Sequence, residues 1–112
     1  MKLIKINELP EKGVSHNPRI RKREILANGE LASITNYARA VFPPGEVAGS
    51  HLHNDMAEVF MAESGCGEIR VNDVAYVFSP GTVVLVEPGD VHEIANTGST
   101  DLVVVYFGVK IS

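Results

Sequence analysis

Three histidines and one glutamate lie in two short segments of the chain at spacings that suit a metal ion. His51 and His53 are separated by one residue, Glu58 follows shortly after, and His92 lies in a second segment. Histidine is the commonest metal ligand among side chains. Three imidazoles with one carboxylate would suit Fe, Mn, Ni, Co, Cu or Zn, and the set does not select among these metals. It would leave a coordination position open, as a catalytic metal requires.

Each of these signals has an ordinary alternative when taken alone. An H-x-H pair on a strand is often two exposed imidazoles, and a single histidine such as His92 is usually structural. The predicted strands that carry these residues, and the glycines and prolines that flank them, distinguish between a metal site and ordinary histidines.

Turn-forming residues divide the chain at short and regular intervals, for example at Pro43-Pro44-Gly45 and Pro88-Gly89. The stretches between them are rich in Val, Ile, Phe and Tyr, which favours strands over 34–42, 58–62, 68–71, 75–78, 82–86 and 102–109. Asn72-Asp73 predicts a tight hairpin turn. No long segment has a helical apolar period, so we expect an all-β sandwich or barrel.

The strand pattern also places the candidate ligands. Residues two apart on a strand face the same side, so His51 and His53 would lie side by side. The spacing to Glu58 breaks this alternation, so the chain must bend at residues 54–56 for Glu58 to face inward on the next strand. His92 follows a Pro-Gly turn and is expected to begin another strand.

The glycines and prolines around the histidines complete a pattern that resembles the two motifs of the cupin superfamily. The motif positions present are Gly45, His51, His53, Glu58 and Gly65 in the first motif and Gly81, Pro88, Gly89, His92 and Asn96 in the second. Pro88 stands one place nearer the glycine than usual, within a turn. The spacer between the motifs is short for a cupin.

The resemblance implies an all-β fold, a single-domain cupin-type jelly-roll β-barrel with a metal at one end of a cavity. It makes His51, His53, Glu58 and His92 the four ligands of a divalent transition metal. One domain over residues 1–112 is implied, with N-terminal strands or an arm in 1–30 and the barrel core in 31–110.

Cupins commonly bury exposed sheet faces in dimers, so the resemblance also implies a homodimer. Apolar residues of the first thirty positions are the candidate interface: Ile4, Ile6, Ile20, Ile25 and Leu26.

Four side chains are candidates for the cavity wall. Phe60 shares the face of Glu58 and would make the wall apolar. If Tyr37 and Arg39 point inward, Arg39 could hold a substrate carboxylate and Tyr37 could donate a proton; if they point outward, both are ordinary solvent-facing residues. Tyr106 has the same two alternatives.

Composition excludes several classes of protein. The net charge of −4 argues against a nucleic-acid binder. We interpret the basic cluster of residues 19–23 as a solvated strand face or edge, with a phosphate-binding or partner-docking patch as the alternative. The single cysteine, Cys66, cannot form an intrachain disulfide and is expected to be a small buried hydrophobe.

No stretch approaches the roughly 20 apolar residues of a membrane helix. The N-terminus is too short and too charged for a signal peptide. We therefore expect a soluble cytoplasmic protein without a membrane partner.

Function is less readable than fold, because one fold supports many activities. We expect a small-molecule metalloenzyme of oxygenase, decarboxylase or isomerase type, acting on a small organic acid or similar ligand, with catalytic residues unassigned. The alternative is a non-catalytic binding or sensing module, which fits a chain with no obvious general acid or base beyond the metal ligands.

Overall fold

Short strands joined by tight turns make up most of the chain. The computed structural model describes residues 1–111, so Ser112, the last residue of the expected domain, lies outside the described part. The elements are η1 (Ile6–Glu8), β1 (Glu11–Val14), β2 (Asn17–Leu26), β3 (Ile34–Phe42), β4 (Val47–His51), β5 (Met56–Ser64), β6 (Gly67–Val71), β7 (Val74–Phe78), β8 (Val83–Val86), β9 (His92–Ala95) and β10 (Leu102–Lys110). The prediction of an all-β chain is confirmed. No helix in residues 1–111 is long and apolar enough to span a membrane.

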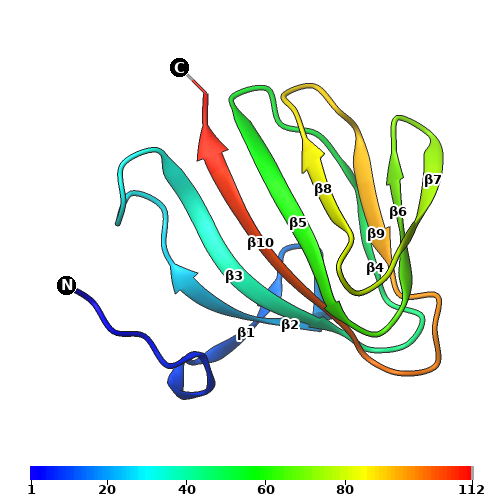
Figure 1. Cartoon of the computed structure of the whole chain (residues 1–112), viewed down its shortest axis with the longest axis horizontal. Helices are drawn as coiled ribbons and strands as arrows, with labels where there is room; N and C mark the ends of the chain where they lie inside the picture. The colour runs from blue at the N-terminus through cyan, green and yellow to red at the C-terminus, as the bar shows by residue number, and fades with distance from the viewer. Residues whose placement is uncertain (112) are drawn as a thin grey trace.

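The strands form two antiparallel sheets that face each other (Figure 1). One sheet has the order β1-β2-β3-β10-β5-β8, and the other has the order β4-β9-β6-β7. From β3 to β10 the chain crosses between the sheets at every connection except the β6–β7 hairpin, an arrangement that is consistent with a jelly roll. Among residues 1–111 the two sheets are separate hydrogen-bonded units, so the closed barrel that the resemblance implied is observed as a two-sheet sandwich.

The N-terminal residues form a strand pair on this frame, which decides between the two expected arrangements. β1 pairs with β2, and β2 pairs in turn with β3, so both strands extend the six-stranded sheet of the same chain. Ile20 and Ile25 are buried within the chain itself. These two side chains are therefore not available for the subunit interface that the sequence suggested.

The core fills the space between the sheets. Its buried side chains come from both layers and are Ile20, Ala40, Phe42, Phe60, Ala62, Ile69, Phe78, Val86, Ile94, Leu102 and Val104. The free thiol of Cys66 is exposed, so the expectation of a buried cysteine was wrong. Cys66 lies in the turn between β5 and β6, where the backbone rather than the side chain is packed.

Tight turns fix the ends of the strands. Asn72 and Asp73 both have positive φ, 49° and 67°, and join β6 to β7 in the predicted hairpin. Gly65 has a φ of +84°, and a Cβ at this position would meet the backbone carbonyl of Asp101. Glycine is required there for two reasons, conformation and space.

Candidate metal centre and cavity

The four candidate ligands meet at one end of the space between the sheets. His51 ends β4 and is the direct cross-strand partner of His92, which begins β9. Glu58 reaches the same point from β5 in the other sheet. His53 lies just beyond β4, and the backbone N–H of Gly89 donates a 2.7 Å hydrogen bond to its carbonyl. The expected bend before Glu58 is present, because β5 does not start until Met56.

The side chains of these residues converge on a single point. One ligand atom from each of His51, His53, Glu58 and His92 lies within 4.8 Å of the others. Glu58 Oε1 is 3.3 Å from His53 Nε2 and also 3.3 Å from His92 Nε2. Ligands bound to one metal ion at about 2.0–2.2 Å are separated by distances of this order.

Backbone carbonyls orient two of the rings. His51 Nδ1 lies 2.8 Å from the Gly49 carbonyl, and His92 Nδ1 lies 3.2 Å from the Asp90 carbonyl. A carbonyl only accepts, so Nδ1 carries the hydrogen in both rings and Nε2 has a free lone pair. Metal-binding histidines are commonly held in this way by a hydrogen bond from the second nitrogen.

Two polar atoms at the centre have no hydrogen-bond partner among the described residues. They are Glu58 Oε1 and His92 Nε2, on side chains that are 5% and 1% exposed. A buried polar atom left without a partner costs roughly 1–3 kcal/mol. A divalent ion would satisfy both atoms together, so the residues present fit a metal.

The side chain of Asn72, in the β6–β7 turn, supports the segment before His92. The Asn72 amide donates to Asp90 at 2.9 Å, and its oxygen accepts from the Val91 backbone N–H at 3.0 Å. The hydrogen bonds from Asn72 and from the Glu87 backbone N–H hold the pKa of Asp90 below its usual value. The hairpin turn therefore fixes the loop that presents His92.

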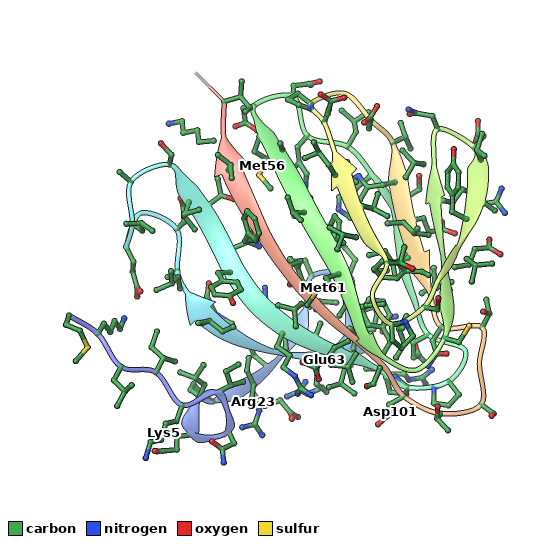
Figure 2. The ribbon with its side chains drawn as sticks, viewed as in Figure 1. Lys5, Arg23, Met56, Met61, Glu63 and Asp101 are labelled. Carbon is green, nitrogen blue, oxygen red and sulfur yellow. The ribbon has the colours of Figure 1, made fainter. Side chains whose placement is uncertain are left out.

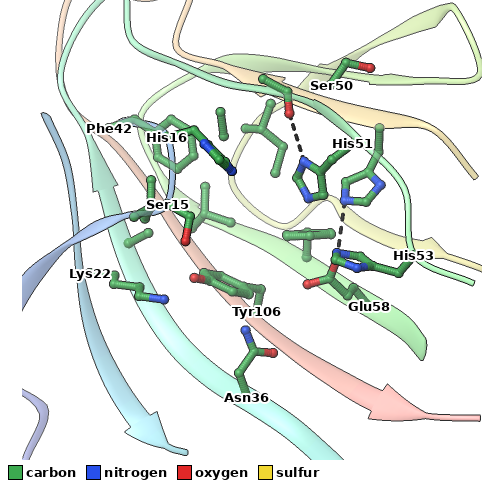
Figure 3. A pocket seen from close by; sticks show the side chains of 18 of the residues that line it. Ser15, His16, Lys22, Asn36, Phe42, Ser50, His51, His53, Glu58 and Tyr106 are labelled. Atoms are coloured by element: carbon green, nitrogen blue, oxygen red, sulfur yellow. Dashed lines mark hydrogen bonds and ion pairs between the residues drawn. The ribbon is translucent and has the colours of Figure 1, made fainter. Parts of the chain in front are cut away.

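A cavity of about 490 Å³ extends from the candidate metal centre between the sheets (Figure 3). Its walls are largely apolar and include Ala40, Phe42, Phe60, Ile94 and Val104. Phe60 packs against one of the candidate ligands, because its ring centroid is 5.6 Å from that of His92. A space of this size admits a small organic molecule.

Two of the four expected wall residues line the cavity. Phe60 and Tyr106 do so, and their rings are stacked with centroids 5.5 Å apart. Burial, together with the negative charge of Glu58, raises the pKa of Tyr106 to about 12. The Tyr106 hydroxyl is therefore protonated at neutral pH and can donate a hydrogen bond.

The other two, Tyr37 and Arg39, are not part of the wall. The face of β3 that points inward carries small and apolar side chains, so alternation puts Tyr37 and Arg39 on the outer face. Tyr37 packs edge-on against Phe107 with centroids 6.3 Å apart. Arg39 forms an ion pair of 2.7 Å with Glu63, and this pairing raises the pKa of Arg39 and lowers that of Glu63.

A family profile described as "Cupin domain" matches residues 38–108. This chain belongs to the cupin superfamily. The matched stretch contains all four candidate metal ligands, and the resemblance read from the glycine and histidine spacing is confirmed.

Proteins similar to this cupin have names that refer to different functions. The chain is 35% identical to the oxalate-binding protein of Thermotoga maritima over 66 residues, which is 59% of this chain and only 54% of that protein. Its fold is similar to the crystal structure of a predicted oxalate decarboxylase from Thermotoga maritima, with a TM-score of 0.92, 23% identity, and coverage of 98% of this chain and 100% of the other. A sugar phosphate isomerase of the cupin superfamily from Silicibacter pomeroyi has a TM-score of 0.84, 12% identity, and coverage of 98% and 76%. The two structural similarities establish the fold and leave the substrate open.

The cavity of this cupin also contains polar residues that the sequence did not reveal. They are Ser15, His16, Lys22, Asn36 and Ser50. Lys22 was interpreted as one of a solvated basic cluster, yet it lies on the inner face of β2. The signal was available, because Lys22 is two residues from Ile20, which is fully buried.

Proposed function

We propose that this cupin binds one divalent transition-metal ion through His51, His53, Glu58 and His92 and acts as an enzyme on a small organic acid in the adjoining cavity. The observation that carries the proposal is the pair of unsatisfied buried atoms, Glu58 Oε1 and His92 Nε2, which lie at the meeting point of the three imidazoles. Such atoms are rare in folded proteins, and one bound ion would satisfy both.

When bound, a metal of this kind supplies a Lewis acid or redox centre with a coordination position open to a carboxylate. The chain's own residues would prepare that position. The carbonyls of Gly49 and Asp90 hold two imidazoles in the tautomer that presents Nε2. Phe60 and Ile94 keep the adjoining wall apolar, which limits water around the acid and strengthens its attraction to the metal.

The choice of an organic acid rests on two supports. A relative that is 35% identical over 66 residues is named an oxalate-binding protein. The Tyr106 hydroxyl, with a pKa of about 12, provides a neutral donor in the same cavity, which suits a carboxylate oxygen.

A non-catalytic binding module is the second candidate. The name of the same relative refers to binding rather than to a reaction. Tyr106 is a poor base because its pKa lies far above neutral pH, so it would orient an acid rather than take a proton from it. Tight binding of an acid to the metal-loaded protein without turnover would favour this candidate.

Metal analysis tests the proposal directly. We expect the purified protein to contain about one equivalent of a single transition metal by elemental analysis, and an anomalous-scattering map to place it between the four ligands. His51→Ala and His92→Ala should lose the metal. His16→Ala is the control, because His16 lines the cavity but lies outside the ligand group. A protein that holds none of these metals and binds none on addition would overturn the proposal.

A further inference from the structure

The side chain of Lys22 distinguishes the cavity from a simple apolar space. Arg21 and Arg23, its neighbours on β2, form ion pairs with Glu11 on the outer face. Lys12 on β1 is the cross-strand partner of Lys22, and its Nζ lies 2.6 Å from Oε2 of Glu24. Lys22 itself has no ion pair or side-chain hydrogen bond within residues 1–111, and it lines the cavity.

Small residues on β3 give this side chain access to the cavity. Lys22 is in register with Ala40, and Ala38 occupies the next inward position. Both alanines are buried and leave the space above β3 unfilled by their own side chains. Figure 3 shows the Lys22 ammonium directed over this strand toward Tyr106. The Asn36 amide lies on the same wall.

The cavity therefore has two separate ends that attract anions. At one end, a divalent ion with the single carboxylate of Glu58 retains net positive charge. At the other end is the Lys22 ammonium, with the Tyr106 hydroxyl between them. Among residues 1–111, Glu58 is the only acidic residue that lines the cavity. Glu24, two residues from Lys22 and in register with Ala38, is paired with Lys12, so Lys22 has no anionic partner in the cavity.

The separation of the two ends sets a lower limit on the length of a bridging molecule. Glu58 is on β5 and Lys22 is on β2, three strand positions away in the sheet order. At 4.7–4.9 Å for each position, the backbones are about 14 Å apart across the sheet. Side chains on a strand stand roughly perpendicular to the sheet, so they shorten this lateral separation only in part. In oxalate the two carboxylates are directly bonded, so a metal-bound oxalate would not reach Lys22.

We propose that Lys22 is a specificity-determining residue, and that the molecule taken by this cavity is a dianionic aliphatic acid longer than oxalate. One carboxylate would occupy the open position of the metal and the second would pair with the Lys22 ammonium. The apolar walls formed by Phe42 and Val104 would contact the methylene chain between them. This inference rests on the proposed function, because it requires the metal to hold the first carboxylate.

Isothermal titration of the Mn²⁺-loaded protein with matched acids tests the inference. The pairs are succinate with butyrate and adipate with hexanoate, and oxalate is included as the short diacid. We expect at least one of the longer diacids to bind about tenfold or more tightly than its matched monoacid, as a charge-assisted hydrogen bond would provide. Lys22→Met should lower the affinity of the longer diacids to that of their matched monoacids, and Lys22→Arg should retain most of the preference.

Lys5→Met is the matched control. It removes the same charge from an exposed residue outside the cavity lining and should leave the diacid preference intact. Equal binding of diacids and monoacids, or a preference that survives Lys22→Met, would overturn the assignment of Lys22 while metal-dependent acid binding still stood. Loss of the preference in His16→Ala but not in Lys22→Met would also overturn it. If no acid binds the Mn²⁺-loaded protein, the proposed function itself fails, and this inference with it.

Discussion

His51 and His92 are direct partners across the β4–β9 ladder, and their ring centroids lie 4.2 Å apart. Backbone pairing therefore brings two ligands together that are far apart in the sequence. Glu58 comes from the opposite sheet, so the candidate ligands lie where the two sheets approach each other at one end of the sandwich. Because strand pairing forms this arrangement, we expect the site to be largely built before any metal binds.

Because the site forms before a metal binds and contains unsatisfied polar atoms, we expect it to lower the stability of the metal-free protein while it favours metal binding. Glu58→Met replaces a buried carboxylate, one of whose oxygens has no partner, by an apolar side chain of similar length. In the presence of EDTA we expect this variant to be about 1 kcal/mol more stable to urea than the original protein. Added metal should stabilise the original protein by about 2.7 kcal/mol at 100 times the Kd and should have no effect on the variant.

Glu58→Gln is the control for this substitution. It retains a polar group at the same position, so it should lose the metal-dependent stabilisation without gaining stability in EDTA. A Glu58→Met protein that is clearly less stable than the original in EDTA would show that the carboxylate stabilises the fold without a metal.

The β6–β7 turn gives a second prediction, which concerns metal affinity. The Asn72 side chain forms hydrogen bonds with Asp90 and Val91, whereas within residues 1–111 the Asp73 side chain forms none. Both residues have positive φ, so glycine fits the backbone at either position. We expect Asn72→Gly to weaken metal binding about tenfold, because the segment before His92 loses its support. Asp73→Gly should leave affinity within about twofold, as measured by competition with a chromogenic chelator.

The sequence predicted the parts of the fold that depend on local rules. The bounds of β3, the hairpin at Asn72-Asp73 and the inward turn of Glu58 all follow from alternation and turn chemistry. The cluster of ligands was predicted as well, because glycines at fixed positions framed the histidines. The strand bounds, the hairpin and the turn of Glu58 need only information from neighbouring residues, whereas the pairing of His51 with the distant His92 was predicted through the resemblance to cupins.

Features that depend on which face a strand presents were harder to predict. Tyr37 and Arg39 alternate with alanines on β3, and both faces of that strand looked plausible until β10 and β5 fixed the inner side. Lys22 was grouped with the neighbouring arginines by charge, although alternation separates it from them. The place of His16 in the cavity wall depends on where the turn between β1 and β2 lies relative to the other strands, which no local pattern shows.

Gly65 allows a test of the turn that leads into β6. Its φ of +84° disfavours any side chain, and a Cβ there would also collide with the Asp101 carbonyl. We expect Gly65→Ala to lower the free energy of unfolding by about 3 kcal/mol, since both strain and overlap apply. Gly29 has a φ of +88° with open space around it. Gly29→Ala should therefore cost only about 1 kcal/mol in the same urea titration. Equal losses in the two variants would show that the contact with Asp101 is relieved at little cost.

Tyr106 predicts a specific loss of stability in alkali. Its pKa is raised from 10.0 to about 12 in the folded protein, so the unfolded chain loses this proton first as the pH increases. The stabilisation is therefore complete below pH 10 and declines as the pH rises toward 12. Between pH 8 and pH 11, Tyr106→Phe should lose about 1 kcal/mol less stability than the original protein. The comparison belongs in EDTA, because a metal beside Glu58 would offset the negative charge that contributes to the shift. Parallel pH dependences of the two proteins would contradict the prediction.

The outer face of the six-stranded sheet leads to the last prediction, which concerns the homodimer. Met61 and Val83 are cross-strand partners on β5 and β8, and together with Leu85 they are 38%, 57% and 58% exposed. The Arg39–Glu63 pair lies on the same face, and Figure 2 labels Met61 and Glu63 along β5. Because the pair carries both signs of charge, a second copy turned by a two-fold axis can meet this face with apolar contacts and matching charges.

We therefore propose that two copies associate through this face, rather than through the buried isoleucines of the N-terminal strands. Light scattering should give the mass of a dimer for the original protein and that of a monomer for Met61→Lys combined with Leu85→Lys, because each lysine would place an unpaired charge in the interface. Tyr76→Lys is the control. Combined with Val74→Lys, it adds the same two charges to exposed positions on β7 in the other sheet, and this variant should remain dimeric. A monomeric mass for the original protein would remove the proposal, and dissociation of this control variant alone would move the interface to the four-stranded sheet.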